Sequence, residues 1–310
     1  MMMKKLIAVL AAAVFCFFGC SGKTEDGNGY TFTDDLGRTV TVASHERTAA
    51  LLGSFADVWM LAGGEICASA ADAWEDFDLD LPNTTVNLGS LKTLSLEGLF
   101  AVEPDFVIAG TKSHQNIAWQ ETLDAAGITA AYFDVISFDD YLEMLKICTD
   151  ITGREDLYEK NGTAVQAVIE KTLAAAEKRV AEHGAPTVLL LRAAASGVKV
   201  KNSHGTVLGE MLADLGCVNI ADNDENLLEN LSLESILTAD PERIFVVPMG
   251  GDAEETRMIM ESMFAENPAW YELTAVKEGH IHYMDKRLYN LKPNARWGEA
   301  YEQLEAIFAE

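Results

Sequence analysis

Short apolar runs alternate with helix-like segments along most of the chain from residue 30 onward. The apolar runs predict buried strands, and the longer segments between them repeat apolar residues at helical spacing. Strands that alternate with helices form parallel sheets with crossover helices, so the pattern predicts an α/β fold. The predicted strands are residues 49–52, 106–109, 130–133, 188–191 and 244–247, and the predicted helices include residues 116–126, 206–215 and 253–264.

The alternation breaks in the middle of the chain. A capping-box pattern, in which Ser137 is followed three residues later by Asp140, predicts the start of one helix. Residues 155–182 repeat apolar side chains at helical spacing, which predicts a second helix roughly 40 Å long. Asn161-Gly162 interrupts this run and is expected to bend or weaken it. A long helix between two groups of strands predicts a rigid connection between two lobes.

An internal repeat indicates that the two lobes are related. Residues 94–108 read LSLEGLFAVEPDFVI and residues 231–245 read LSLESILTADPERIF. In each copy a serine stands at the N-cap position of a short helix, and a proline ends that helix before the next strand. The repeat therefore places one glutamate, Glu97 or Glu234, in the first turn of an equivalent helix in each lobe.

The N-terminus has the pattern of an export signal. Lys4 and Lys5 precede a 13-residue apolar run at residues 6–18, which is shorter than the roughly 20 apolar residues of a membrane span. The run therefore predicts a signal peptide rather than a membrane helix.

The end of the apolar run is similar to a bacterial lipobox, in which a cysteine is lipidated and becomes the mature N-terminus. Phe17 stands where leucine is usual, three residues before Cys20. We expect a lipoprotein signal peptide at residues 1–19, lipidation at Cys20 and a flexible tether at residues 20–29. The alternative is an ordinary secretory signal with an incidental cysteine.

The charge balance excludes several partners. The 310 residues include 23 Lys and Arg against 49 Asp and Glu, a formal net charge of −26, and signal removal would move it to −28. Such a chain does not neutralise phosphates, which excludes nucleic acid and argues against attraction to anionic lipid headgroups. Hydrophobic residues make up 49% of the chain, which is enough for a large core and excludes a mainly disordered protein.

The cysteines and histidines do not form a convincing metal site. Cys67, Cys148 and Cys217 share no metal-ligand spacing and have apolar neighbours, so we expect buried free thiols. His280 and His282 would share one face of a strand, but strands often carry such residues without a metal. We therefore predict no metal site.

Two segments, residues 30–42 (YTFTDDLGRTVTV) and residues 94–109 (LSLEGLFAVEPDFVIA), are similar to the first hairpin and the most recognisable motif of a known family. The chain resembles the ferric-siderophore, heme and cobalamin class of ABC-transporter substrate-binding proteins. The lipobox, the mid-chain helix and a terminal helix at residues 294–308 also fit, so the resemblance covers roughly residues 30–309. These motifs are specific for the class and weak for the ligand.

The resemblance implies two Rossmann-like α/β lobes joined by a single long backbone helix, with a ligand cleft between the lobes. The expected division is an N-terminal lobe at residues 30–152, a linking helix at residues 153–184 and a C-terminal lobe at residues 185–310. The resemblance further implies a monomeric binding protein outside the cytoplasm, anchored to the cell membrane by its lipid, with no intrinsic cofactor and no enzyme activity. Such a protein captures an iron chelate, first of all a ferric siderophore, and delivers it to a dimeric ABC permease with its cytoplasmic ATPase. Corrinoid or heme is the alternative ligand.

The resemblance also implies a role for Glu97 and Glu234. In this family one acidic side chain on each lobe docks onto basic pockets of the two permease subunits. Two carboxylates at matching places on two lobes suit a partner with two-fold symmetry. The alternative is that both residues are helix-start acids that interact favourably with the helix dipole.

Two basic stretches in the second lobe contrast with the acidic chain. Residues 185–209 contain Arg192 and two lysines but no acid, and residues 277–296 carry a net charge of +3. Ligands gather beyond the carboxyl ends of strands in open α/β sheets, so Arg192, directly after a predicted strand, is the first candidate for binding an anionic group. Arg296 in the terminal motif is the second candidate. The alternative is solvated surface charge.

Four further residues are ligand-binding candidates. Trp74, in a predicted polar loop, could cover a flat ligand face, although it could equally cap the core. Met249 ends a predicted strand and would suit heme as an axial ligand, as would His204. Lys92 and Tyr289 are weaker candidates.

Two remote alternatives remain for the function. A zinc- or manganese-binding protein would use a cluster of histidines and carboxylates, for which His114 and His204 are candidates. An exported hydrolase has little support, because the chain lacks the G-x-S-x-G nucleophile motif. Ser196 and Lys199 match S-x-x-K, but in a predicted turn rather than at the helix start that this chemistry needs.

Overall fold

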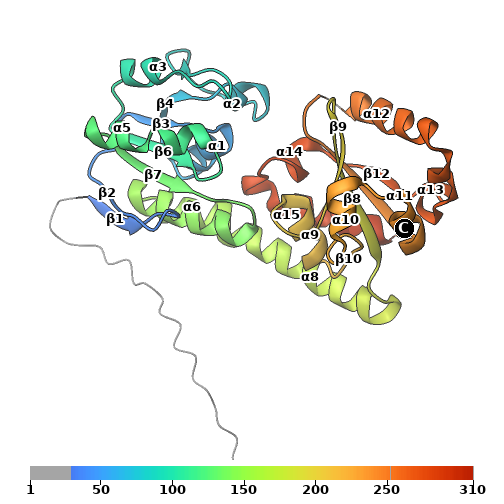
Figure 1. Ribbon diagram of the computed structural model, residues 1–310. Coiled ribbons are helices and arrows are strands. Elements are labelled where there is room, and N and C mark those ends of the chain that lie inside the picture. Colours follow the sequence, from blue (N-terminus) through green and yellow to red (C-terminus); the bar gives the residue numbers. More distant parts are fainter. Residues whose placement is uncertain (1–28, 252, 310) are drawn as a thin grey trace, which may run out of the picture.

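Two separate five-stranded sheets form the framework of the molecule (Figure 1). The structure is a computed structural model that describes residues 29–251 and 253–309, so the predicted signal peptide and Cys20 lie outside the described residues. The first sheet contains β3 (Thr48–Ala50), β4 (Ile66–Ser69), β5 (Val86–Asn87), β6 (Phe106–Gly110) and β7 (Thr129–Phe133). The second contains β8 (Thr187–Ala194), β9 (Gly197–Lys201), β10 (Val218–Asn219), β11 (Arg243–Pro248) and β12 (Ile281–Tyr283).

The two sheets share one strand order, which gives the sequence repeat a structural counterpart. The order is β5-β4-β3-β6-β7 in the first sheet and β10-β8-β11-β12 in the second, so that β4-β3-β6-β7 matches β10-β8-β11-β12. These strands are parallel, and only β9 pairs in the antiparallel direction, with β8. The predicted α/β fold with parallel sheets is confirmed. We call β3–β7 with their helices the first lobe and β8–β12 with their helices the second lobe.

Helices connect the strands on both sides of each sheet (Figure 1). The predicted helix at residues 116–126 is split at Trp119, whereas those at residues 206–215 and 253–264 differ from α9 and α12 only at their ends. Among the described residues, no helix has the length and apolar character needed to cross a membrane. A hairpin of β1 (Tyr30–Thr33) and β2 (Thr39–Val42) precedes the first sheet. The helices of the first lobe are α1 (Gly53–Leu61), α2 (Asp72–Glu75), α3 (Leu96–Ala101), α4 (His114–Ala118), α5 (Gln120–Ala125) and α6 (Phe138–Thr152), and those of the second are α9 (Val207–Asp214), α10 (Glu225–Asn230), α11 (Leu233–Ala239), α12 (Ala253–Glu266), α13 (Thr274–Lys277), α14 (Lys286–Tyr289) and α15 (Trp297–Ala306).

A long helical segment runs between the lobes (Figure 1). It consists of α7 (Glu155–Tyr158), a π-helical turn (Glu159–Thr163) and α8 (Ala164–His183). The π turn contains the predicted interruption at Asn161-Gly162, where the side-chain amide of Asn161 donates to the carbonyl oxygen of Leu61 at 2.8 Å. The hydroxyl of Tyr141 donates to the carbonyl oxygen of Asn161 at 2.9 Å. The irregular turn is therefore a junction at which the segment is fixed to α1 and α6.

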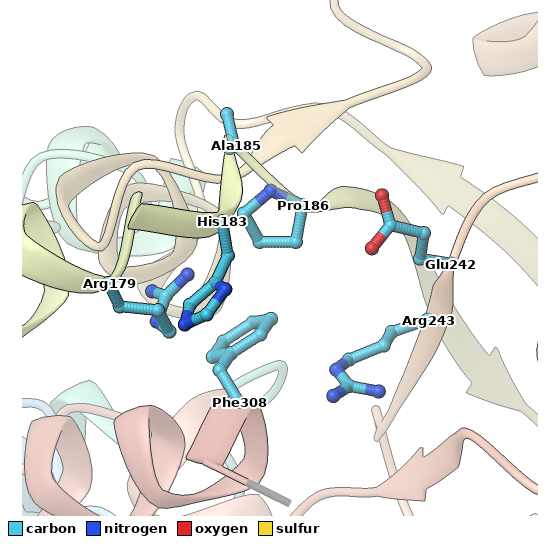
Figure 2. A pocket seen from close by; sticks show the side chains of 8 residues that line it. Arg179, His183, Ala185, Pro186, Glu242, Arg243 and Phe308 are labelled. Atoms are coloured by element: carbon cyan, nitrogen blue, oxygen red, sulfur yellow. The ribbon is translucent and has the colours of Figure 1, made fainter. Parts of the chain in front are cut away.

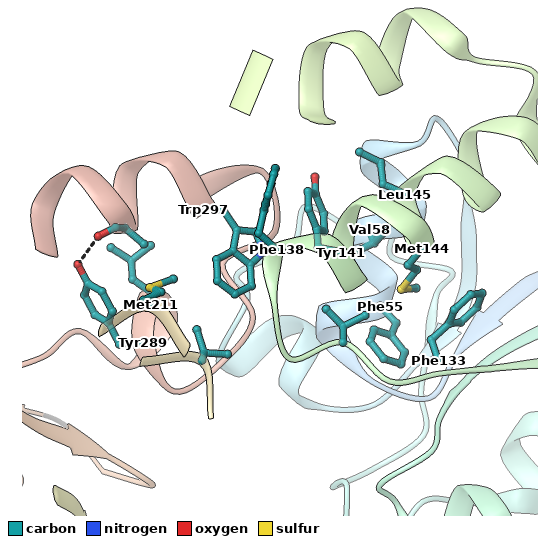
Figure 3. Close-up of a cluster of buried hydrophobic side chains, with 14 of the residues drawn as sticks. Phe55, Val58, Phe133, Phe138, Tyr141, Met144, Leu145, Met211, Tyr289 and Trp297 are labelled. Carbon is teal, nitrogen blue, oxygen red and sulfur yellow. Dashed lines mark hydrogen bonds between the residues drawn. The ribbon is translucent and has the colours of Figure 1, made fainter. Parts of the chain in front are cut away.

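One hydrophobic cluster extends from the first lobe to the second (Figure 3). Phe55 and Phe138 contribute to it from the first lobe, and Met211 and Trp297 contribute from the second. The rings of Phe138 and Trp297 lie 6.2 Å apart, centroid to centroid. Two further clusters cover the opposite faces of the two sheets, as expected because side chains alternate along a strand. The shared cluster makes the interface between the lobes part of the core.

Candidate ligand-binding site

Segments that follow the carboxyl ends of strands in the two sheets meet at the interface between the lobes, because the residues after β12 contact α1, which follows β3. In each sheet the chain first builds one side outward from a central strand and later returns to build the other side. The direction changes between β3 and β6 in the first sheet and between β8 and β11 in the second. Ligands of open α/β sheets bind at such switch points, outside the carboxyl ends. Helices α1 and α2 follow β3 and β4, and α14 follows β12; these helices lie between the two sheets (Figure 1).

Residues 284–297, which we call the strap, lead from β12 back to the first lobe. Within the strap, the guanidinium of Arg287 donates to the carboxylate of Asp57 on α1 at 2.8 Å. The amide of Asn294 donates to the carbonyl oxygen of Ser54 at 2.9 Å and to the Asp57 carboxylate at 2.8 Å. These bonds hold the strap against α1.

Burial shapes the chemistry of the pair formed by Asp57 and Arg287. Their side chains are only 16% and 18% exposed. Burial raises the pKa of Asp57, while the hydrogen bond from Asn294 and the charge of Arg287 lower it. Burial lowers the pKa of Arg287, whose guanidinium also lies 4.0 Å from the ring centroid of Phe77. Each charge therefore depends on the other.

A second charged contact crosses the interface at α2. The ammonium of Lys286 lies 2.5 Å from a carboxylate oxygen of Asp76, directly after α2. At the other end of α2, the Asp72 carboxylate accepts from the backbone N–H of Gly53 at 2.9 and 3.0 Å. Trp74 lies between these two contacts and is partly exposed. The expectation of a polar loop at Trp74 is wrong, because these contacts hold a short helix there.

Arg192 lies at the switch point of the second sheet, between Val247 of β11 and Lys199 of β9. The strand continues to Ala194, so Arg192 lies within β8 and not after it as expected. Its Nε atom is buried and has no hydrogen-bond partner among the described residues. Burial lowers the pKa of Arg192. The sheet holds the backbone at this position, while Nε of the guanidinium has no partner among the described residues.

Two lysines of β9 extend the positive charge around Arg192. Lys199 pairs with Arg192 across the β8–β9 hairpin, and Lys201 pairs with Leu190, two residues before Arg192. The three cations therefore share one face of the sheet, because side chains alternate along each strand. Burial lowers the pKa of Lys201, and the charges of Arg192 and Lys199 lower it further. In the described part of the chain no carboxylate forms an ion pair with any of the three, so the group, which we call the cationic cluster, suits an anion.

Met249 lies next to the cationic cluster. It directly follows β11 and its backbone N–H donates to the carbonyl oxygen of Ala193 at 2.8 Å. Its side chain is 59% exposed, which is unusual for a large apolar residue at the end of a buried strand. An apolar ligand surface could therefore contact it beside the switch point.

Three other ligand-binding candidates do not provide a free side chain at the switch points. Tyr289 is buried and its hydroxyl donates to the carbonyl oxygen of Ala300 at 2.9 Å, so it is a core residue and the ligand-binding expectation is corrected (Figure 3). Arg296 forms two hydrogen bonds with the Glu299 carboxylate, at 2.7 and 2.8 Å, which neutralise its charge locally. Lys92 is exposed in the loop before α3.

Glu97 and Glu234 occupy equivalent places in the two lobes. Each is exposed and is the second residue of its helix, α3 or α11. The N-cap serines are Ser95, which accepts from the N–H of Gly98, and Ser232, which accepts from the N–H of Ser235. Neither glutamate carboxylate forms an ion pair within the described part of the chain, so both face solvent as free charges.

The described histidines and cysteines lie apart from one another and from clusters of acidic side chains. Within residues 29–251 and 253–309, no three His, Cys, Asp or Glu side chains are grouped so as to hold a metal ion. The His282 ring stacks on Phe245 with 5.1 Å between centroids, and His280 lies 3.6 Å from the Glu278 carboxylate. The three described cysteines are free thiols, and the tryptophans at positions 59, 119 and 270 are buried.

A small cavity of about 140 Å³ lies at the far end of α8 (Figure 2). Arg179, Arg243 and Phe308 line it, but Arg179 already donates to Glu305 at 2.9 Å. Glu242 and the carboxyl end of α8 add negative charge or negative dipole to the same cavity. The cavity lies away from both switch points and offers no strong site for an anion.

Comparison with known proteins places the chain in a family. A family described as "Periplasmic binding protein" matches residues 49–288, which is most of the chain. The chain belongs to this family. Both switch points and the larger part of α14 lie within the matched range.

Two proteins of Bacillus subtilis (strain 168) are similar to this periplasmic binding protein over most of their length. The Fe(3+)-citrate-binding protein YfmC is 25% identical over 292 residues, covering 91% of this chain and 89% of the relative. The putative ABC transporter substrate-binding lipoprotein YhfQ is 23% identical over 305 residues, covering 93% of this chain and 90% of the relative. The chain therefore spans nearly the full length of both proteins.

Solved structures share the fold of this periplasmic binding protein. SirA of Staphylococcus aureus, complexed with staphyloferrin B, has a TM-score of 0.67 at 18% identity, covering 90% of this chain and 98% of SirA. IsdE of S. aureus, complexed with heme, has a TM-score of 0.68 at 17% identity, covering 84% of this chain and 99% of IsdE. At this identity the likeness shows the fold alone. The shared fold agrees with the family match.

Replacing Asp57 with Asn tests the contact between the strap and α1. The substitution leaves Arg287 as a largely buried cation without a carboxylate, so we expect the free energy of unfolding to fall by about 3 kcal/mol. Urea unfolding measures this change. The control is Asp156→Asn, which breaks an exposed pair with Arg154 and should leave stability nearly unchanged. Equal stability of the two variants would contradict the proposed importance of the contact.

The Asp72 carboxyl, which holds α2 against α1, predicts a pH dependence of stability. Burial raises its pKa to about 6, although the hydrogen bond from Gly53 lowers it. Between about pH 4 and pH 6 the Asp72 carboxyl is therefore protonated in the folded state and ionised in the unfolded state. The free energy of unfolding falls as the pH rises through this range, by about 3 kcal/mol in total. Urea unfolding of the wild type and Asp72→Asn should show their stability difference shifting in favour of the variant over this range. A difference independent of pH would refute the assignment.

Proposed function

We propose that this periplasmic binding protein captures an anionic iron chelate, of the ferric citrate or carboxylate siderophore type, for an ABC importer. The cationic cluster at the switch point of the second sheet carries this proposal. Arg192, Lys199 and Lys201 concentrate positive charge in a chain of net charge −26, and Nε of Arg192 is buried with no partner in the described part of the chain. The name of the relative YfmC, an Fe(3+)-citrate-binding protein, supports the same ligand class.

The proposed mechanism is binding without covalent chemistry. A guanidinium can bind a carboxylate through two parallel hydrogen bonds, which fixes orientation as well as charge. Partial burial strengthens the attraction, because water screens the charges less than at an open surface. The ferric ion itself remains the cargo, held by the oxygens of its own chelator. The protein recognises the negative outer surface of the chelate.

Removal of the Arg192 charge tests the ligand class. Tryptophan fluorescence titration of the mature protein should show binding of ferric citrate, and Arg192→Gln should weaken it about tenfold or more. Arg154→Gln is the matched control, because Arg154 is an exposed arginine paired with Asp156. Binding of free zinc or manganese ions without a chelator would refute the proposal.

Heme or a corrinoid is the second candidate ligand. The exposed Met249 beside the cationic cluster favours it, because a thioether can ligate heme iron and an apolar side chain can cover a flat macrocycle. The same titration with heme and cobalamin distinguishes the candidates. Tighter binding of either than of ferric citrate would replace the first proposal by the second.

We further propose that lipidated Cys20 holds the protein at the outer side of the cell membrane and that Glu97 and Glu234 dock on the permease. The exposed, unpaired carboxylates at equivalent positions support docking on a partner with two similar subunits. In this proposal the binding protein is a monomer, and the permease works with its own ATPase. YhfQ, named a lipoprotein, supports the lipid anchor.

Charge reversal of Glu97 and Glu234 to lysine tests docking. Uptake of radiolabelled iron chelate by cells should be abolished, while the affinity of the purified variant for the chelate should stay unchanged. The matched control reverses Glu121 and Glu225, which are exposed first-turn acids in α5 and α10, one in each lobe. Loss of chelate affinity in the Glu97/Glu234 variant, or equal loss of uptake in the control, would overturn the docking role.

A further inference from the structure

Lys292 differs from the other cations of the strap. Among the four, Lys286 pairs with Asp76, Arg287 with Asp57 and Arg296 with Glu299. The Lys292 ammonium has no hydrogen bond and no carboxylate within 4.0 Å among the described residues. It is therefore the strap cation whose charge the described part of the protein leaves without a direct partner.

Lys292 lies at the side of the interface formed by the first lobe. Its ammonium is 6.0 Å from the ring centroid of Phe55, in the first turn of α1 just beyond the carboxyl end of β3. Burial lowers the pKa of Lys292, yet the residue keeps part of its exposure. The side chain is thus largely enclosed by neighbouring atoms, in a residue that is not fully buried.

Three carboxylates near Lys292 favour its charged form from a distance, but each has its own local donor. Asp72 accepts from the N–H of Gly53, and Asp134 pairs with Lys112 at 2.8 Å. Asp140 accepts from two backbone N–H groups at the start of α6, at 2.9 and 2.7 Å. None of the three lies within 4.0 Å of the ammonium, so none forms an ion pair with it.

The backbone holds Lys292 in place. Its carbonyl oxygen accepts from Arg287, and Asn294, two residues later, is fixed to Ser54 and Asp57. Asn294 adopts a positive φ of 56°, a conformation that costs about 1 kcal/mol or more and persists here because those bonds hold it. An enclosed, unpaired ammonium is also costly. A fixed backbone that presents such a group is expected where a ligand supplies the missing partner.

We propose that Lys292 binds an anionic oxygen of the chelate from the side of the first lobe, while Arg192 binds the chelate from the second lobe. This inference rests on the proposed function and makes it more specific. Cations on both sides of the interface select a ligand with at least two separated negative groups, such as a ferric polycarboxylate. A chelate without net negative charge would gain nothing from Lys292.

The test compares Lys292→Met, Lys292→Arg and the control Lys277→Met, which alters an exposed lysine paired with Glu272. Titration with ferric citrate should show about a tenfold or greater loss of affinity for Lys292→Met, with little change for the other two variants. Thermal unfolding checks that each variant is folded. Wild-type affinity in folded Lys292→Met would overturn the inference and leave the proposed function intact. Failure of the wild type itself to bind any ferric polycarboxylate would instead overturn the proposed function.

A second measurement reads the contact directly and does not depend on the stability of the Met variant. Reductive methylation with ¹³C-formaldehyde labels the lysines, and the Lys292 resonance is the one missing from the spectrum of Lys292→Arg. Addition of gallium citrate, a diamagnetic substitute for the ferric chelate, should shift this resonance and leave that of Lys277 in place. An unshifted Lys292 resonance in a protein saturated with gallium citrate would overturn the inference.

Discussion

The buried contact of Asp57 with Arg287 and Asn294 is the interaction on which the arrangement of the site depends. The chain connects the two lobes through α7, the π turn and α8. The strap adds a second connection, because it anchors the exit of β12 to the start of α1. Two charges without partners would be unstable at this depth, so each holds the other in place.

The same physics explains why positive charge is concentrated in so few places. About half of the described lysines and arginines form an ion pair with a carboxylate, as Lys286 and Arg296 do. Arg192 and its lysine neighbours find none among the described residues, although burial penalises a charge that is left without a partner. A binding protein that performs no chemistry needs such unpaired cations. An anionic ligand then supplies the partner that the rest of the protein does not provide.

Local patterns predicted the elements because local physics determines them. The capping box at Ser137, the interruption at Asn161-Gly162 and the repeated serine N-caps each depend on residues within a few positions of one another. The two sheets also share one strand order, in agreement with the internal sequence repeat. Arg192 was identified from its place near a strand end, although β8 extends beyond it because β9 pairs with its last residues.

The sequence alone was enough to predict the α/β class, the repeated lobes, the equivalent glutamates and the basic stretch around Arg192. Only the tertiary structure decided which cations are free. Arg296 and Lys292 lie four residues apart in one basic stretch, yet one is neutralised by Glu299 and the other is not. Tyr289 resembles a binding residue in sequence but is buried in the shared core. Partners such as Asp57 and Arg287 are separated by 230 residues, so only the folded chain can show whether a charge is satisfied.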